Sequence, residues 1–328
     1  MKKTKAVALF SGGLDSILAI KLITRQGIQV TALNFKTLFF GLEKYDPPKS
    51  FDFDLKFIDI SNEYMKILRD PIHGYGKNMN PCIDCHAFMF KKAGEYMSKS
   101  NASFIISGEV LGQRPMSQNK GSLRVVEKYS GYPGLILRPL SALRLDETIP
   151  EKDGLVDRSQ LLGISGRSRK RQIELAAQMG IENYPSPAGG CKLTEPGFSK
   201  RLEDLFSQSN YDLKDMELLR IGRHFRLNQN TKLVVGRNKD ENEQINSYFL
   251  NGDVIIKPKH VKGPISILKS TDPITEVMIE QACRIAARYC DRENDDKLDI
   301  SYSSFPGNNE KNKKIEPMTE KELDIIRI

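Results

Sequence analysis

The 328-residue sequence lacks the features that define membrane and secreted proteins. No apolar run approaches the roughly 18 residues needed to cross a bilayer. The apolar stretch at the start ends after Phe10, too short for a secretory signal. Five cysteines do not suggest a disulfide framework, and a chain near 300 residues buries enough surface to fold without one. We therefore predict a cytoplasmic protein with no membrane partner, whose cysteines serve chemistry or metal binding.

The charge balance is basic, with a formal net charge of +8 and a pI near 9.1. Such an excess favours polyanionic partners. It is concentrated in two stretches without acidic residues, 158–171 and 220–239. These stretches indicate either nucleic-acid contact or a solvated basic face, and composition alone leaves both open.

The first half of the chain alternates short apolar runs with longer amphipathic stretches, as parallel βαβ units do. A helix is expected from Asp15 to Gln26, ending before Gly27, which favours a helix end. We predict an α/β fold, a Rossmann-like parallel sheet with helices on both faces. The expected strands are Ala6–Phe10, Val30–Phe35, Leu55–Ile60, Ser103–Ser107 and Leu135–Leu137, with a connecting loop at 41–54.

The length predicts about two domains. We assign 1–206 to the first, with 151–206 as a helical extension containing helices at 168–179 and 197–206. The polar segment 207–215 is the expected boundary. A smaller α+β domain follows at 216–303, with strands at 232–235, 254–256 and 265–268 and a helix at 274–290. Residues 304–328 are expected to be a mobile tail.

The segment Ser11-Gly12-Gly13-Leu14-Asp15-Ser16 lies between a predicted strand and a predicted helix. Two glycines allow a tight turn that presents backbone N–H groups, and the helix N-terminus adds partial positive charge, so the segment suits a phosphate. Asp15 could hold Mg²⁺, and Ser11 and Ser16 could donate hydroxyl hydrogen bonds. The structural alternative is a helix cap with a glycine turn.

This segment resembles the PP-loop of the ATP pyrophosphatase superfamily, which has the HUP, or adenine nucleotide alpha hydrolase-like, fold and cleaves ATP to AMP and pyrophosphate. Residues 107–113 (SGEVLGQ), 117–118 and 137–140 (LRPL) resemble matching stretches of the 4-thiouridine synthetase family ThiI. The resemblance implies an ATP site that includes Gly108, Glu109 and Gln113, with Arg138 a weaker candidate. Without it, these residues would be a strand-end turn and a buried salt bridge.

The cysteines form two groups. Cys82 and Cys85 make a CxxC before a predicted helix, and Cys191 follows a Pro/Gly-rich loop. A helix N-terminus lowers the pKa of nearby thiols. Cys283 and Cys290 lie on an apolar helix face and are expected to be core residues. For His73 and His224 we expect structural roles.

The Asn-Pro-x-x-x-Cys pattern ending at Cys85 resembles the catalytic-cysteine segment of the 2-thiouridylase family MnmA, but Cys82 stands where that family has an acidic residue. A CxxC with a distant third cysteine resembles the cluster-dependent thiolases, such as TtuA. There three cysteines bind a [4Fe-4S] cluster and leave one iron free to hold hydrosulfide. Three alternatives stay open: a zinc site completed by His86 and Cys191, a metal-free persulfide and disulfide pair, and a structural role.

The C-terminal region resembles the RNA-binding domain of the NFACT family, through Gly236-Arg237-Asn238 and residues 258–264 (PKHVKGP). It departs from the family where Ile256 and Lys257 replace an aromatic residue and a histidine. Basic side chains that contact RNA phosphates position the RNA without reading its sequence. The candidate contacts are Arg237, Lys257, Lys259, His260 and Lys262.

Together these resemblances predict an ATP-dependent tRNA uridine thiolase that forms 4-thiouridine or 2-thiouridine with Mg²⁺ and a [4Fe-4S] cluster, or zinc, on Cys82, Cys85 and Cys191. The partners would be tRNA and a sulfur donor, either sulfide or a cysteine desulfurase. A homodimer stays open. The alternatives are a cluster-free persulfide thiolase, a PP-loop amidating or ligating enzyme acting on a small carboxylate, and an RNA-binding adaptor with a vestigial ATP site.

Overall fold

The computed structural model describes residues 3–42, 53–182, 184–186, 190–208, 211–291, 297–307 and 309–328. It divides into two compact units, Met1–Glu195 and Pro196–Ile328. Helix α7 (Pro196–Phe206), which we assigned to the first domain, belongs to the second unit. The reason is an ion-pair cluster, because Asp204 of α7 pairs with Arg226 and Lys232 of that unit's sheet.

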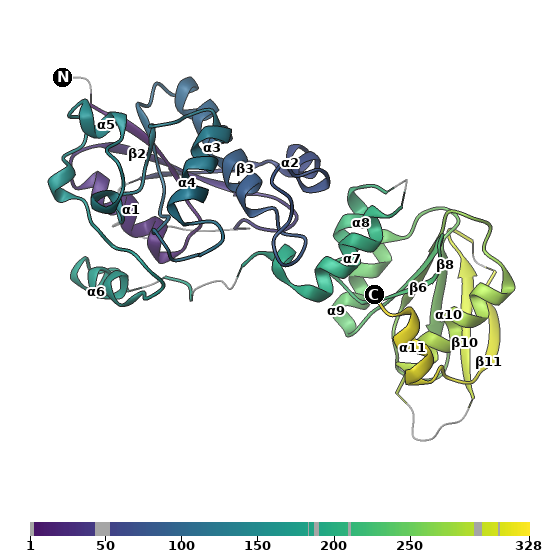
Figure 1. Ribbon diagram of the computed structural model, residues 1–328. Coiled ribbons are helices and arrows are strands. Elements are labelled where there is room, and N and C mark those ends of the chain that lie inside the picture. Colours follow the sequence, from purple (N-terminus) through teal and green to yellow (C-terminus); the bar gives the residue numbers. More distant parts are fainter. Residues whose placement is uncertain are drawn as a thin grey trace. The chain divides into compact units, whose positions relative to one another are not determined.

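The first unit contains the predicted parallel sheet (Figure 1). Its strand order is β3-β2-β1-β4-β5. The register sets Ala6 of β1 opposite Val30 of β2 and Phe104 of β4. All five expected strands are present. Their bounds are β1 (Lys5–Leu9), β2 (Gln29–Lys36), β3 (Asp54–Asp59), β4 (Phe104–Ile106) and β5 (Ile136–Leu137).

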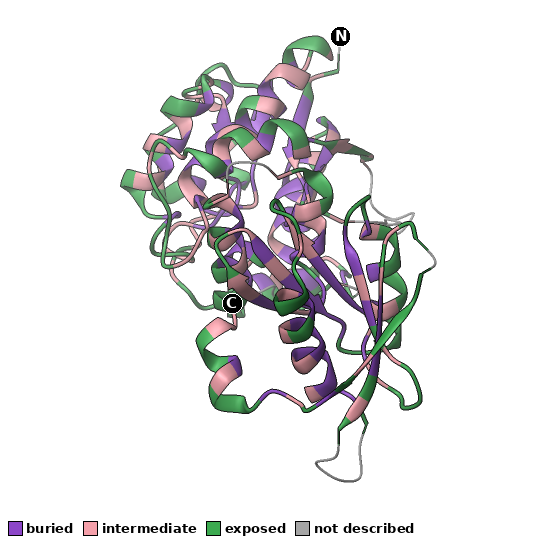
Figure 2. Cartoon of the chain, turned by 90° about the vertical axis from the view of Figure 1, so that its right-hand side faces the viewer, coloured by how far each residue is buried: buried purple, intermediate pink, exposed green. Residues whose placement is uncertain are grey.

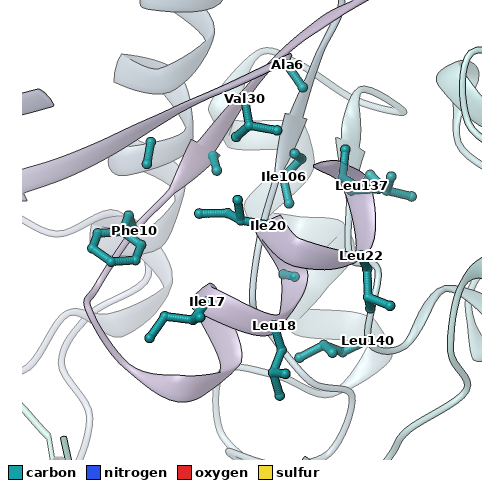
Figure 3. Close-up of a cluster of buried hydrophobic side chains, with 14 of the residues drawn as sticks. Ala6, Phe10, Ile17, Leu18, Ile20, Leu22, Val30, Ile106, Leu137 and Leu140 are labelled. Carbon is teal, nitrogen blue, oxygen red and sulfur yellow. The ribbon is translucent and has the colours of Figure 1, made fainter. Parts of the chain in front are cut away.

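Helices cover both faces of this sheet, which confirms the predicted layers. α1 packs against α6 on one face, whereas α2 and α4 accompany α3 on the other. Figure 3 shows the first core, where Ile20 of α1 lies beside Val30 and Ile106 of the strands. The helices of this unit are α1 (Leu14–Thr24), α2 (Ser61–Arg69), α3 (Cys82–Lys99), α4 (Lys120–Ser130), α5 (Ile149–Lys152) and α6 (Lys170–Gln178), with 3-10 turns at Ala142–Arg144, Arg158–Gln160 and Lys192–Thr194.

The strand order reverses between β1 and β4. In open α/β sheets, ligands bind outside the carboxyl ends of the strands at such a point, because the loops there diverge to opposite faces. The loop after β1 is the candidate phosphate loop, and the turn after β4 contains Gly108. The topology therefore brings together two segments that we assigned separately to an ATP site.

The second unit is built on an antiparallel sheet in the order β11-β10-β8-β9-β7-β6. α10 and α11 pack on the core of one face, and residues of α8 and α9 pack on the other. Figure 2 shows buried residues along the strands and exposed ones on the outer sides of the helices. The bounds are α8 (Leu213–Leu218), β6 (Arg223–Asn228), β7 (Thr231–Val235), α9 (Lys239–Ile245), a 3-10 turn at Asn246–Tyr248, β8 (Val254–Pro258), β9 (Ser266–Ser270), α10 (Glu276–Arg288), β10 (Leu298–Ser304), β11 (Lys311–Ile315) and α11 (Glu320–Ile326).

The segment 304–328, expected to be a mobile tail, is instead part of this unit. β11 pairs with β10, and Leu298 lies opposite Ile315. Met318 and Leu323 are buried in the same core as α10. The segment is therefore ordered by backbone pairing and by a few apolar anchors between its charged residues.

Some predicted features lie outside the described residues. These are most of the 41–54 loop, residues 187–189 before Cys191, residues 209 and 210 of the expected boundary, and Asn308. Within the described ranges, none of the helices combines the length and apolarity required to cross a bilayer.

Candidate functional site

The phosphate loop turns tightly between β1 and α1. Gly12 has a φ of +76°, a conformation that suits glycine. Ser16 Oγ donates to the Gly13 carbonyl at 2.7 Å, and the Gly13 N–H donates to Ser11 Oγ at 3.3 Å. Gly13 stands at the N-cap of α1 and supplies no side-chain cap. The amino end of α1 is therefore suited to an anion.

Gly108 packs directly against this loop. A Cβ atom at Gly108 would lie 2.6 Å from the Ser16 backbone nitrogen and 2.7 Å from the Asp15 carbonyl carbon. These neighbours are backbone atoms that cannot rotate away, so a larger residue would displace the loop. The structure thus gives Gly108 a role in shaping the loop through close approach.

Asp15 and Gln113 are also brought together. Gln113 Nε2 donates to Asp15 Oδ2 at 3.2 Å. Burial raises the pKa of the Asp15 carboxyl, while Arg169, Gln113 and Gln172 favour its charged form. Arg169 and Gln172 belong to α6 and its amino end, which the sequence analysis did not connect with ATP. No sequence motif marks them, since only the docking of α6 places them here.

The contacts of Glu109 are all within the protein's own ion-pair network. Its carboxylate accepts from Arg138 Nε at 2.9 Å and lies 2.7 Å from His86 Nδ1. Arg138 Nη1 also donates to Glu127 at 2.5 Å. Despite burial, Arg138 and His86 hold the pKa of Glu109 at about 2. Glu109 and Arg138 thus form the buried salt bridge that was the structural alternative to nucleotide contact.

The three candidate cysteines gather near the amino end of α3. Cys82 is the first residue of α3, and Asn80 Nδ2 lies 3.2 Å from its sulfur. Cys85 faces the buried Tyr64 of α2. Cys191 is the N-cap of the 3-10 turn Lys192–Thr194, which is tied to the segment before α3 because Asn78 Nδ2 donates to the Thr194 carbonyl at 2.7 Å.

The thiols are close enough to influence one another's ionisation. Burial raises the pKa of Cys85, and the Cys191 and Cys82 thiolates raise it further, although Tyr64 opposes them. Burial likewise raises the pKa of Cys191, against backbone hydrogen bonds from Leu193 and Thr194. Without a cation, these two sulfurs therefore favour the protonated thiol. A bound metal reverses that preference.

The described part of the chain contains no group of three or more His, Cys, Asp or Glu side chains already set out as ligands of one metal ion. His86 directs Nδ1 to Glu109. Asp84, between the two cysteines of the CxxC, accepts from the His73 backbone and lies 2.9 Å from His73 Nδ1. The structure therefore gives His73 the structural partner we expected.

The two remaining cysteines are core residues, as predicted. Cys283 and Cys290 are buried in the cluster that α10 forms with the second sheet. His224 is also buried, with Nε2 lying 2.8 Å from the Ile221 carbonyl oxygen.

A contact between two neighbouring residues connects the phosphate loop with the cysteines. Glu109 follows Gly108, and His86 follows Cys85, so the Glu109–His86 contact links the two segments. The Lys192 N–H, next to Cys191, donates to the Phe39 carbonyl after β2 at 3.4 Å. All three cysteines thus lie near the edge of the sheet at which the strands β1, β2 and β4 end.

The RNA-contact candidates of the second unit are exposed and lie on adjoining segments. Lys257, Lys259, His260 and Lys262 follow one another along the end of β8 and the next loop. Asn242 Nδ2 donates to the Gly263 carbonyl at 3.3 Å, which holds this loop beside α9. Two of the candidates are paired within the fold, because Glu241 pairs with the Arg237 guanidinium and Glu310 lies 3.4 Å from Lys257 Nζ.

Part of each basic stretch is neutralised within the fold. Arg226 and Lys232, from 220–239, pair with Asp204 at 2.6 and 3.0 Å. Arg158, from 158–171, pairs with Glu151 at 2.5 Å. These three cations maintain the fold, so the two stretches are smaller basic surfaces than the sequence indicated.

Comparison with known proteins divides the chain in a similar way. Residues 1–151 match the family described as "Thiamine biosynthesis protein (ThiI)", and residues 222–325 match "NFACT protein RNA binding domain". The chain is 29% identical over 151 residues to the probable tRNA sulfurtransferase of Thermococcus kodakarensis, covering 44% of this chain and 39% of that protein. It is 32% identical over 151 residues to the tRNA-specific 2-thiouridylase MnmA of Petrotoga mobilis, covering 39% of this chain and 41% of that protein.

A solved structure of a 4-thiouridine synthetase–RNA complex with bound ATP aligns at 17% identity and a TM-score of 0.38, covering 66% of this chain and 51% of that one. The chain spans about 40% of the length of the two curated relatives. By the family matches, the first unit contains a ThiI-type domain over residues 1–151, and the second contains an NFACT-type RNA-binding domain over residues 222–325.

Proposed function

We propose that the protein is an ATP-dependent tRNA sulfurtransferase that converts a uridine to a thiouridine. The observation that carries the proposal is the junction of a phosphate loop with a group of three thiols. Gly108 packs on the loop at Asp15 and Ser16, and the adjacent Glu109 contacts His86, which follows Cys85. Activation and sulfur delivery would then occur at one edge of one sheet.

The chemistry needs ATP because a uridine carbonyl oxygen is a poor leaving group. In the proposed reaction, this oxygen attacks the α-phosphorus, the bond to the β-phosphate oxygen breaks, and pyrophosphate leaves. Sulfur then attacks the activated ring carbon, and AMP departs with the former uridine oxygen. The phosphate loop orients the triphosphate, and positioning with charge neutralisation supplies most of the catalysis. Asp15 is the residue that would hold the accompanying Mg²⁺.

The three cysteines are the proposed sulfur-carrying group. Thiolates are the preferred ligands of iron–sulfur clusters, and three of them would leave one iron open for a sulfur ligand. The mutual influence of the thiols supports a shared centre, although their side chains would have to turn to form ligand geometry.

In this proposal, the second unit binds the tRNA substrate. The exposed Lys257, Lys259, His260 and Lys262 suit phosphate contacts, which position RNA without selecting a sequence. A base must be accessible for chemistry of this kind, so the target uridine would have to be exposed from the folded tRNA.

Mass spectrometry of tRNA nucleosides tests the proposal. The purified protein, incubated anaerobically with unmodified tRNA, ATP, Mg²⁺ and sulfide, is expected to produce one thiouridine per tRNA, with AMP and pyrophosphate in equal amounts. Omission of ATP should abolish the product. Formation of AMP on a small carboxylate without tRNA would instead establish the amidating or ligating alternative.

A further inference from the structure

Four buried side-chain atoms without a hydrogen-bond partner belong to one residue of the phosphate loop and two residues at the amino end of α6. Within the described residues, these are Asp15 Oδ1, Arg169 Nε, and both polar atoms of Gln172. Gln172 is completely buried. Native proteins pair nearly all buried polar groups, because an unpaired one destabilises the fold. Such a concentration at one place indicates groups that are arranged for a ligand.

Two contacts place α6 at the loop. The Gly166 N–H donates to the Leu111 carbonyl at 2.7 Å, and Leu111 forms a parallel bridge with Ser165. These bonds hold the segment before α6 against the turn that contains Gln113, which itself donates to Asp15. α6 then packs against α1, the helix that begins at the loop (Figure 1).

The polarity of the three residues is complementary to a nucleotide phosphate with its cation. Arg169 supplies positive charge and an unpaired donor, and Asp15 supplies an unpaired acceptor. Gln172 supplies an amide, and neither of its two polar atoms forms a hydrogen bond. Arginine is well suited to the oxygens of a departing pyrophosphate, where charge develops in the transition state.

We propose that Arg169 contacts the β- and γ-phosphates of bound ATP and that Gln172 is a positioning residue that orients the Asp15 carboxylate. The inference rests on the proposed use of ATP. Both residues lie between the two family matches, in the segment 152–221, so neither match assigns them a role. In this protein, the helical extension completes the phosphate site of the ThiI-type domain.

Binding of ATP, pyrophosphate and AMP, measured by calorimetry in Mg²⁺, separates Arg169 from the rest of the site. Arg169→Ala is expected to weaken ATP and pyrophosphate binding by about 10- to 100-fold and to change AMP binding less than about twofold. Arg169→Lys should recover part of the loss. Arg171→Ala is the matched control, because Arg171 lies on the same helix with its side chain 78% exposed, and we expect no change.

Gln172→Met tests the positioning role through two readouts of opposite sign. Methionine has a similar shape and removes two unpaired polar atoms, so the free protein should melt a few degrees higher. The further rise in melting temperature caused by ATP and Mg²⁺ should be largely lost. A residue with only a structural role would lower the melting temperature of the free protein.

The outcomes distinguish this inference from the proposed function. If the unaltered protein binds ATP and Arg169→Ala binds ATP and pyrophosphate equally well, the inference is overturned and the proposed function stands. Equal weakening of AMP and ATP would also overturn it, because Arg169 would then not discriminate the outer phosphates. If the unaltered protein binds no ATP, the proposed function and the inference both fail.

Discussion

Replacement of Cys82, Cys85 or Cys191 by alanine is expected to lower the rate of tRNA thiolation by roughly 1000-fold or more, the scale of losing a reacting group. Pyrophosphate release that depends on tRNA should persist in all three variants, because activation precedes sulfur transfer and does not involve the thiols. The measurement is parallel quantification of thiouridine and pyrophosphate. The expected pattern is activation without sulfur delivery.

Cys283→Ala is the control for this series. Cys283 is completely buried in the core of the second unit, so its loss should cost about 1 kcal/mol of stability and leave thiolation unchanged. Wild-type thiolation by Cys191→Ala would remove that residue from the sulfur-carrying group.

The metal content of anaerobically purified protein identifies the group that carries the sulfur. A cluster on the three cysteines predicts ~4 iron atoms and ~4 acid-labile sulfides per chain, lost in each alanine variant. Stoichiometric zinc without iron would contradict the cluster and establish the zinc alternative. Thiolation by a protein free of both metals would establish the persulfide alternative.

Glu109→Gln is expected to lower the free energy of unfolding of the first unit by about 3 kcal/mol, because it removes a buried carboxylate from between Arg138 and His86. The pKa of Glu109 is about 2 in the fold, below its ordinary value of 4.5. A lowered carboxyl pKa stabilises the fold above about pH 4.5, and this contribution disappears as the pH falls toward 2. The difference between wild type and variant should therefore shrink across that interval.

Hydrogen exchange of peptides from β4 and α3, followed between pH 5 and pH 2.5 after correction for intrinsic exchange, locates the effect in the first unit. Glu127→Gln is the control. Glu127 binds the same Arg138, but its side chain is 24% exposed, and we expect a cost of about 1 kcal/mol. Equal protection of wild type and Glu109→Gln at pH 5 would show that the ion pair contributes nothing.

The sequence predicted the centre of the first sheet well because the central strands β1, β2 and β4 are largely buried and apolar. Ala6, Val30 and Phe104 are all nearly inaccessible, and such runs between amphipathic stretches are typical of parallel strands. The phosphate loop could also be predicted, because its conformation depends on residues that are adjacent in the sequence. Glycines between a strand and a helix are enough to specify the turn.

The error at 304–328 has a physical reason. β11 is an edge strand whose residues include Lys311, Lys313 and Lys314, and its sequence therefore resembles a solvated tail. Lysines on edge strands prevent pairing with other chains. The strand is identified by its pairing with β10 and by the burial of Ile315. Neither of these can be deduced from the composition of the segment.

The partners of the site residues could not be predicted, because they depend on packing between distant segments. Glu109 lies 23 residues from His86 and 29 from Arg138. The family resemblance implies a nucleotide contact for Glu109, and the structure shows its carboxylate in the buried ion pair that was the alternative. Arg169 and Gln172 reach Asp15 only through the docking of α6 on α1.

Transfer of the uridine oxygen tests the central claim most directly. Unmodified tRNA transcribed with uridine labelled with ¹⁸O at both carbonyls is incubated with the protein, ATP and sulfide, and the AMP is analysed by mass spectrometry. If the nucleobase oxygen attacks the α-phosphorus, each thiouridine is matched by one AMP that carries a single ¹⁸O atom. Thiouridine formed together with unlabelled AMP would contradict the account, because ATP would then have activated something other than the base.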